Sequence, residues 1–156
     1  MTEFSWPSRT TADAMARAGW TAGRDFDTRS WFAELGAQGY LVFAYADEIL
    51  SSCGGLTIAP IQVAGALYAG RRIEFDPLSV GDGMRERYAE IEIRLGQRVC
   101  PLADCGGESA LLVLENGIVV EDWSGGVRML GESFPEALDL AIRRHRWPAT
   151  MLEFRG

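Results

Sequence analysis

The sequence holds a single histidine, His145, which restricts the nucleophilic chemistry that the chain could perform. A Ser–His or Cys–His dyad needs an imidazole as its general base, so any such dyad must use His145. This residue lies between Arg144 and Arg146 at the end of a predicted helix, where a cationic side chain complements the negative helix terminus. The sequence therefore favours a structural position for His145, and it excludes a metal site built on two histidines.

Three cysteines, Cys53, Cys100 and Cys105, are the remaining candidate nucleophiles and soft metal ligands. The four-residue spacing between Cys100 and Cys105 could begin a metal site, but the chain has no matching pair of cysteines or histidines to complete it. An odd number of cysteines in a chain of 156 residues also argues against a disulfide framework. We therefore expect buried or incidental thiols in a reducing cytoplasm.

Neither the carboxylates nor the glycine pairs form a pattern that is typical of a catalytic or nucleotide-binding site. Glu121 and Asp122 are neighbours on a predicted strand, where successive side chains point to opposite faces, so both cannot enter one pocket. The glycine-rich segments lack the Lys-Ser/Thr of a P-loop and the GxGxxG spacing of a dinucleotide fold. No clustered acidic loop suggests a Ca²⁺ or Mg²⁺ site. We expect a protein that is not an enzyme and that needs no cofactor.

The charge of the chain favours a protein partner over a nucleic acid. It has 22 acidic and 15 basic residues and a formal net charge of -7. Such a surface repels phosphate backbones and attracts a basic protein, although solubility alone would also explain it. No stretch approaches the roughly 18 consecutive apolar residues of a membrane span, and residues 1–7 carry no basic signal-peptide region. We predict a soluble protein that is not exported and that binds no membrane.

Apolar periodicity, capping residues and glycine stops predict the helices. The expected helices are 11–18 with Thr10 as cap, a second one capped by Asp27 or Thr28 and ending at Leu35, 42–53, 82–95 with Asp82 as cap, and a last one that opens at Ser133. The glycines give the strongest local signal. Gly19 follows the first helix, and in a Schellman ending Trp20 would fold back on Met15.

Alternating and β-branched residues predict the strands. These are 72–76, 98–102, 110–114, 118–123 and 127–130, with a type I′ turn at Asn116-Gly117 and Pro77 ending the first strand. The segment 60–70 is expected to be a loop that could end in a strand. Together the elements predict one α+β domain over residues 1–156, an antiparallel β-meander flanked by N-terminal helices, a middle helix and a C-terminal helix.

An ordered series of short segments carries a family resemblance across nearly the whole chain. The segments are 15–24 (MARAGWTAGR), Trp31, 53–56 (CGGL), 75–78 (FDPL), Tyr88 before Leu95-Gly96, 99–102 (VCPL) and 130–138 (LGESFPEAL). In this order they resemble the SUKH superfamily of bacterial immunity proteins, in particular its group with a Gly-Trp and a Gly-Arg near the N-terminus. Gly106-Gly107 and the segment 60–70 depart from the family's pattern, and both are expected in binding loops.

The resemblance implies a non-enzymatic antidote, made in the cytoplasm, that binds and neutralises a cognate protein toxin. Toxins of such systems are often nucleases or nucleic-acid deaminases, many of them basic, and the acidic balance of this chain would suit such a partner. A monomer or a weak dimer is expected. Two other functions stay open: a regulatory or scaffolding module of the same fold with an endogenous partner, and a small enzyme or ligand-binding domain.

The residues shared with the family are interpreted as structural, because a helix stop, a turn or a core anchor explains each of them. They are Gly19, Trp20, Gly23, Arg24, Gly54, Gly55, Leu56 and Gly131, the last in a turn before a helix cap. Exposed acids and aromatics on strands and turns are the candidate contacts for a partner, since aromatic anchors and desolvated charges dominate interface energetics. These candidates are Glu74, Asp76, Glu108, Glu121, Asp122 and Trp123.

Overall fold

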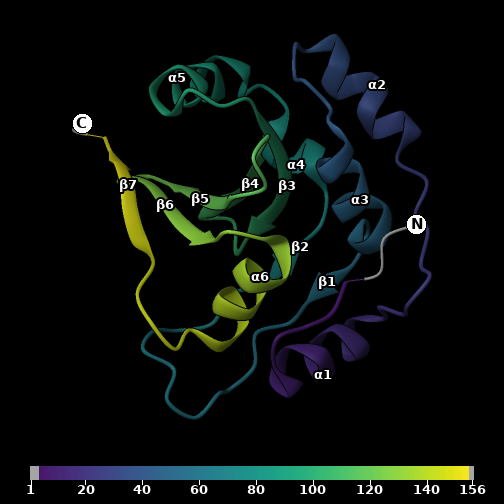
Figure 1. Cartoon of the computed structure of the whole chain (residues 1–156), viewed down its shortest axis with the longest axis vertical. Helices are drawn as coiled ribbons and strands as arrows, with labels where there is room; N and C mark the ends of the chain where they lie inside the picture. The colour runs from purple at the N-terminus through teal and green to yellow at the C-terminus, as the bar shows by residue number, and fades with distance from the viewer. Residues whose placement is uncertain (1–3, 155–156) are drawn as a thin grey trace.

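The computed structural model describes residues 4–154, which form one antiparallel sheet and six helices (Figure 1). The helices are α1 (Arg9–Ala18), α2 (Arg29–Ala37), α3 (Ala44–Cys53), α4 (Pro77–Gly81), α5 (Arg85–Leu95) and α6 (Phe134–Arg143). The strands are β1 (Thr57–Ile58), β2 (Ile73–Glu74), β3 (Val99–Cys105), β4 (Ser109–Leu114), β5 (Val119–Trp123), β6 (Gly126–Gly131) and β7 (Ala149–Glu153). Each strand pairs with the next one along the chain. The predicted α+β meander with flanking helices is confirmed.

Helices cover both faces of the sheet. On one face α6 packs against β5 and β6, and α1 packs against α6. On β5, Glu121 lines a small cavity together with Ala141 of α6, whereas its neighbour Asp122 binds Arg87 of α5. Because neighbouring strand residues point to opposite faces, α5 and α6 lie on opposite sides of the sheet.

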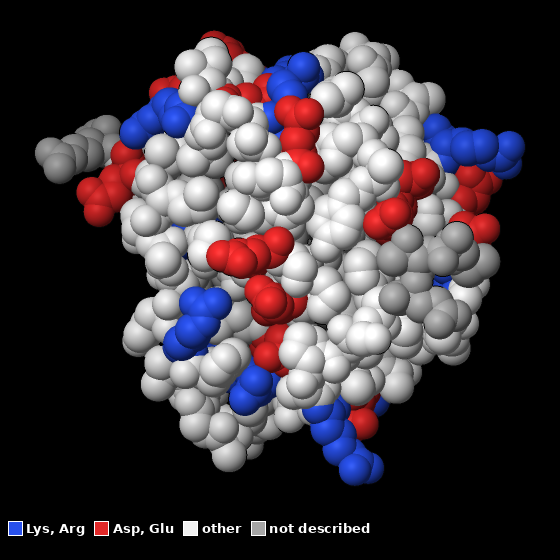
Figure 2. All heavy atoms as spheres, in the orientation of Figure 1, with Lys and Arg blue, Asp and Glu red and all other residues white. Residues whose placement is uncertain are grey.

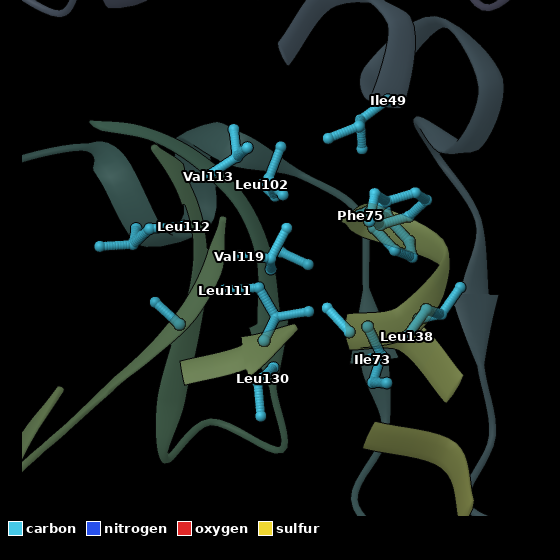
Figure 3. Packing of buried hydrophobic residues seen from close by; sticks show 14 of the residues in the cluster. Ile49, Ile73, Phe75, Leu102, Leu111, Leu112, Val113, Val119, Leu130 and Leu138 are labelled. Carbon is cyan, nitrogen blue, oxygen red and sulfur yellow. The ribbon is translucent and has the colours of Figure 1, made fainter. Parts of the chain in front are cut away.

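The hydrophobic core follows from this arrangement. All six residues of β4 are buried, as a continuous apolar run predicts for a strand that is covered on both faces. Figure 3 shows Leu111 directed toward Ile73 and Leu138, while Leu112 points to the other side of the strand. Burial on both faces makes the middle of the sheet the rigid frame on which the hairpin loops are carried.

The first predicted helix starts two residues too late. It begins at Arg9, and Ser8 rather than Thr10 is its cap, because the Ser8 Oγ accepts a hydrogen bond from the Thr11 amide at 3.2 Å. The end of this helix is confirmed. Gly19 has a φ of 102°, as a left-handed cap requires.

The short helix α4 is missing from the sequence-based prediction. Asp76 caps it by accepting a hydrogen bond from the Leu78 amide at 3.0 Å, and Pro77 stands in its first turn, where its missing N–H is not needed. Pro77 therefore opens a helix as well as ending a strand. Asp82 terminates α4, so the prediction that it caps the next helix is wrong, and α5 begins at Arg85.

The turn between β4 and β5 lies where it is predicted, but its type is wrong. A type I′ turn needs positive φ at both central residues. Here Gly117 has a φ of 94°, and Arg144 is the only residue with a side chain in this region within the described chain, which excludes Asn116. The Gly117 amide donates to the Leu114 carbonyl at 2.9 Å, as in a three-residue hairpin loop with one left-handed glycine.

Two further segments complete the comparison. The segment 60–70 is a loop, as predicted, and β2 follows it at Ile73. The edge strand β7 is not predicted, because Ala149–Glu153 has no clear alternation and none of its residues is buried. Its position is fixed by pairing with β6 and not by an apolar pattern of its own.

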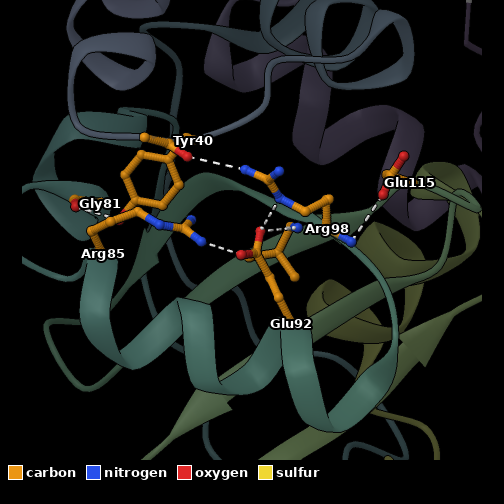
Figure 4. A network of polar contacts seen from close by, with 8 residues as sticks. Tyr40, Gly81, Arg85, Glu92, Arg98 and Glu115 are labelled. Carbon is orange, nitrogen blue, oxygen red and sulfur yellow. Dashed lines mark hydrogen bonds and ion pairs between the residues drawn. The ribbon is translucent and has the colours of Figure 1, made fainter.

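A buried carboxylate, Glu92, joins α5 to its surroundings (Figure 4). Arg85 binds one of its oxygens, and the other accepts hydrogen bonds from Arg98 Nε and the Val99 amide, both at 3.0 Å. Arg98 also donates to the Gly39 carbonyl at 3.0 Å. The network thus ties α5 and β3 to the connection between α2 and α3.

Acidification is expected to weaken this network. Burial alone would raise the pKa of Glu92, but hydrogen bonds from Arg85, the Val99 amide and Arg98 outweigh it and hold the pKa below its ordinary value of 4.5. A lowered folded-state pKa stabilises the fold above the unfolded pKa, and this stability is lost as the pH falls through the folded pKa. Urea titrations between about pH 5 and pH 3 measure how the free energy of unfolding depends on pH. The wild type should take up as much as about one more proton on unfolding than Glu92→Gln does in this range. An unchanged slope would contradict this role of Glu92.

Candidate functional site

Three carboxylates form a row across neighbouring strands at one end of the sheet. Glu74 of β2 lies opposite Asp104 of β3. Asp104 lies opposite Ala110 of β4, and Ala110 lies opposite Asp122 of β5. Directly opposed residues on neighbouring strands share a face. The row therefore lies on the face that α5 covers.

A cleft of about 340 Å³ opens beside this row. Helices α4 and α5 and the segment between them form one wall, with Met84 and Tyr88 as apolar lining. The tips of the β3–β4 and β5–β6 hairpins form the other wall, and they bring in Glu108 and Trp123. The sheet thus gathers Glu108, Asp122 and Trp123 of the predicted contact residues in one cleft, with Glu74 in the adjoining row.

The cleft carries more negative than positive charge. The carboxylate of Asp122 accepts two hydrogen bonds from Arg87, at 2.7 and 2.8 Å, and these bonds raise the pKa of the guanidinium. Asp104 and Glu108 make no ion pair with any of the residues 4–154. Of the three carboxylates that line the cleft, Arg87 compensates only Asp122. Asp104 and Glu108 can therefore receive a cationic side chain of a partner.

The expectation that Glu121 and Asp122 are exposed is wrong. Their exposed fractions are 2% and 5%. Glu121 points away from the cleft toward α6, where it binds Arg71, Arg128 and the Ser109 hydroxyl. Buried carboxylates are retained when cations and hydrogen bonds compensate them, so Glu121 belongs to the folded core and offers no contact surface.

The other predicted contacts differ in what they offer. Glu108 is exposed at the tip of the β3–β4 hairpin. Asp76 is occupied as the cap of α4, and Glu74 lies 3.7 Å from Arg72 in a solvent-exposed ion pair. Trp123 is half-buried, and the guanidinium of Arg128 lies 4.8 Å from its ring centre. Glu108 is therefore the most available carboxylate of the predicted set.

A second group of acids is visible on the face shown in Figure 2. Red side chains gather near the centre of that view, where Figure 1 places the start of α6. Glu132 and Glu136 are the exposed acids of this segment. Acids in the first turn stabilise a helix through its positive end, so the helix itself explains Glu136.

The motif residues of the N-terminal region meet at the end of α3. The indole Nε1 of Trp20 donates to the Ser52 hydroxyl at 2.9 Å, and Arg24 donates to the Ser52 carbonyl at 3.1 Å. A Cβ on Gly54 would come within 2.8 Å of the Phe26 ring, so only glycine allows this approach. The segment that follows α1 therefore packs across the end of α3, which lies about 30 residues further along the chain.

The remaining motif residues also lie in backbone positions that restrict the side chain. Gly23 and Gly55 have φ values of 82° and 80°, and Leu56 is buried. The prediction that Gly131 lies in a turn is wrong, because this residue belongs to a strand. It ends β6, and a Cβ there would lie 2.6 Å from the backbone nitrogen of Ala137 in α6.

The thiols and the histidine do not form a reactive arrangement. Burial raises the pKa of Cys53, Cys100 and Cys105 to about 12, which holds them as neutral thiols at neutral pH. His145 is exposed after the end of α6. Within residues 4–154 no cluster of three or more potential metal ligands is present. No helix in the same range has the length and apolarity to span a membrane.

Sequence reasoning missed Asp104 and Arg87, although both shape the cleft. The signal for Asp104 is the strand register, since only the pairing with Glu74 and Ala110 shows which face it shares. Arg87 is separated from Asp122 by 35 positions, so no local pattern indicates the pair.

Comparison with known proteins gives one match. A family model described as SUKH-3 immunity protein matches residues 7–143, which is most of the chain and includes the cleft. No curated protein and no solved structure matches the chain.

Proposed function

Because the chain belongs to the SUKH-3 immunity protein family, we propose that it binds a cognate protein toxin and neutralises it by covering the toxin's functional surface. The observation that supports this most directly is the cleft lined by Asp104 and Glu108, two carboxylates that make no ion pair within residues 4–154. The protein supplies shape and charge, and it carries out no reaction.

The chemistry of the cleft favours a basic toxin, such as a nuclease or a nucleic-acid deaminase. A lysine or arginine that binds a phosphate in the free toxin can be bound by Asp104 or Glu108 instead. Met84 and Trp123 supply apolar and aromatic surface beside these acids. Complementary charge raises the association rate more than the final affinity.

The same proposal places the protein in the cytoplasm as a monomer or weak dimer. Cys53, Cys100 and Cys105 are all free and buried, which suits a reducing compartment. An antidote that meets its toxin inside the cell needs no partner copy for this action.

The proposal is tested with each candidate toxin domain that the reading frames on either side of this gene encode. Asp104→Lys combined with Glu108→Lys should slow association at low salt by about tenfold or more, and the difference should shrink at high salt. Stopped-flow binding measures the rate. The matched control is Asp13→Lys with Asp25→Lys, which makes the same change in net charge at exposed positions of the N-terminal region.

The outcomes separate the function from the site. A toxin that stays fully active in excess wild-type protein would contradict the proposed function. Equal slowing by both double variants would show that net charge acts, and the cleft would then be excluded as the contact surface.

A further inference from the structure

Two segments without any acidic residue meet on the surface of this acidic protein. Residues 49–73 and 140–152 contain no aspartate or glutamate, although the chain has 22. The Leu67 amide donates to the Arg144 carbonyl at 2.9 Å, and the rings of Tyr68 and Trp147 lie 4.8 Å apart. The loop between β1 and β2 and the connection between α6 and β7 thus form one continuous surface.

Arg144 fixes the loop in place. It has a φ of 54°, a region that costs free energy for a residue with a side chain. Its buried guanidinium donates to the carbonyls of Ile61 and Tyr68 at 2.5 and 2.7 Å. The loop between β1 and β2 covers residues 59–72, and ordered loops of this length without secondary structure are often functional. The hydrogen bonds from Arg144 order the loop before any partner binds.

Large apolar side chains are nevertheless exposed on this surface. Trp147 is 62% exposed and Leu67 is 49% exposed. Tyr68 is half-buried, with its ring against that of Trp147. We call these three residues together with Arg146 the Trp147 patch. Tryptophan, tyrosine and arginine are the residues that most often dominate the energy of protein interfaces.

The charge beneath the patch is positive. Arg71, Arg144 and Glu121 line a small cavity together with Tyr68, and Arg128 binds Glu121. Arg146 is exposed beside Trp147 and makes no ion pair within residues 4–154. Three guanidiniums against one carboxylate, with Arg146 at the rim, reverse the sign of the net charge locally.

We infer that the Trp147 patch binds an apolar surface of the toxin that is bordered by carboxylates. A second copy of this chain in a two-fold dimer is disfavoured, since the same positively charged surface would face its own copy. The inference rests on the proposed function and extends it to a second surface. Gly106 lies at the tip of the β3–β4 hairpin, and a Cβ built on it would be 3.2 Å from the Cβ of Arg71. The loop that carries Leu67 and Tyr68 therefore contacts the hairpin that lines the acidic cleft. Two surfaces of opposite charge that border one hairpin would fix the register of a partner.

The test measures binding of the cognate toxin domain by patch variants. Trp147→Ala should weaken the affinity roughly 30-fold, which corresponds to about 2 kcal/mol, and Leu67→Ser should weaken it at least about fivefold. Ile93→Ser is the matched control, because Ile93 is 81% exposed on α5 and should leave the affinity unchanged. Thermal unfolding of each variant separates loss of contact from loss of fold.

The sign of the opposing charge is tested with Arg146→Glu. If the toxin presents carboxylates, this variant associates several times more slowly at low salt than wild type. Faster association would overturn the assignment. Binding by Trp147→Ala and Leu67→Ser at wild-type affinity would also overturn it, while leaving the proposed function intact. Absence of binding by the wild type would instead contradict the proposed function, and the inference with it.

Discussion

Replacing Glu121 with alanine is expected to lower the free energy of unfolding by about 3 kcal/mol or more. Glu121 is 2% exposed and compensates Arg71 and Arg128, whose side chains are 27% and 24% exposed. Removing the carboxylate leaves two guanidiniums close together in a poorly solvated place. Chemical denaturation measures the loss, and Glu108→Gln at the exposed hairpin tip should change stability by less than about 0.5 kcal/mol.

A triple variant shows whether charge or packing causes this loss. When a buried ionic group is replaced as a whole by apolar side chains, the cost is often small. Changing Glu121, Arg71 and Arg128 together to leucine should therefore recover most of the stability that Glu121→Ala loses. If the triple variant is less stable than the single one, the arginines contribute through other contacts, such as that of Arg71 with Ser109.

The burial of Glu121 also explains where sequence reasoning about the site stops. The strand period predicts that Glu121 and Asp122 face opposite sides, and the structure confirms it. The strand period does not predict which side chains bind these two carboxylates. Arg71 lies 50 positions from Glu121 and Arg87 lies 35 positions from Asp122, so tertiary pairing decides which acids are free.

The same division holds for the fold. Elements with a local physical signal are found: Gly19 ends α1, Gly96 ends α5, and Ser133 caps α6 by accepting a hydrogen bond from the Glu136 amide. Elements without one are missed. The helix α4 has five residues, too few for a period, and β7 is held by pairing with β6. Asp104, the acid that defines the cleft, is likewise visible only through the register of the sheet.

Replacing Gly131 with alanine is expected to destabilise the protein, because the added methyl group would meet the backbone of α6. A Cβ there would lie 2.6 Å from the Ala137 nitrogen and 3.0 Å from its Cα. These are backbone atoms inside α6, so they can yield only if the helix moves away from β6. Overpacking of this kind typically costs about 1–3 kcal/mol, and we expect Gly131→Ala to lie near the upper end.

Gly36→Ala is the matched control for Gly131→Ala, because it adds the same methyl group within α2, where no atom lies within 4 Å. It should stabilise the protein by about 0.5–1 kcal/mol, since alanine is the better helix former and has a less flexible unfolded state. Opposite signs for the two substitutions in thermal unfolding would attribute the cost to contact between β6 and α6. If Gly131→Ala is neutral, α6 can move from the sheet at little cost. The position of α6 would then depend on its apolar face, on Phe134 and Leu138, and not on the close approach of its backbone to β6.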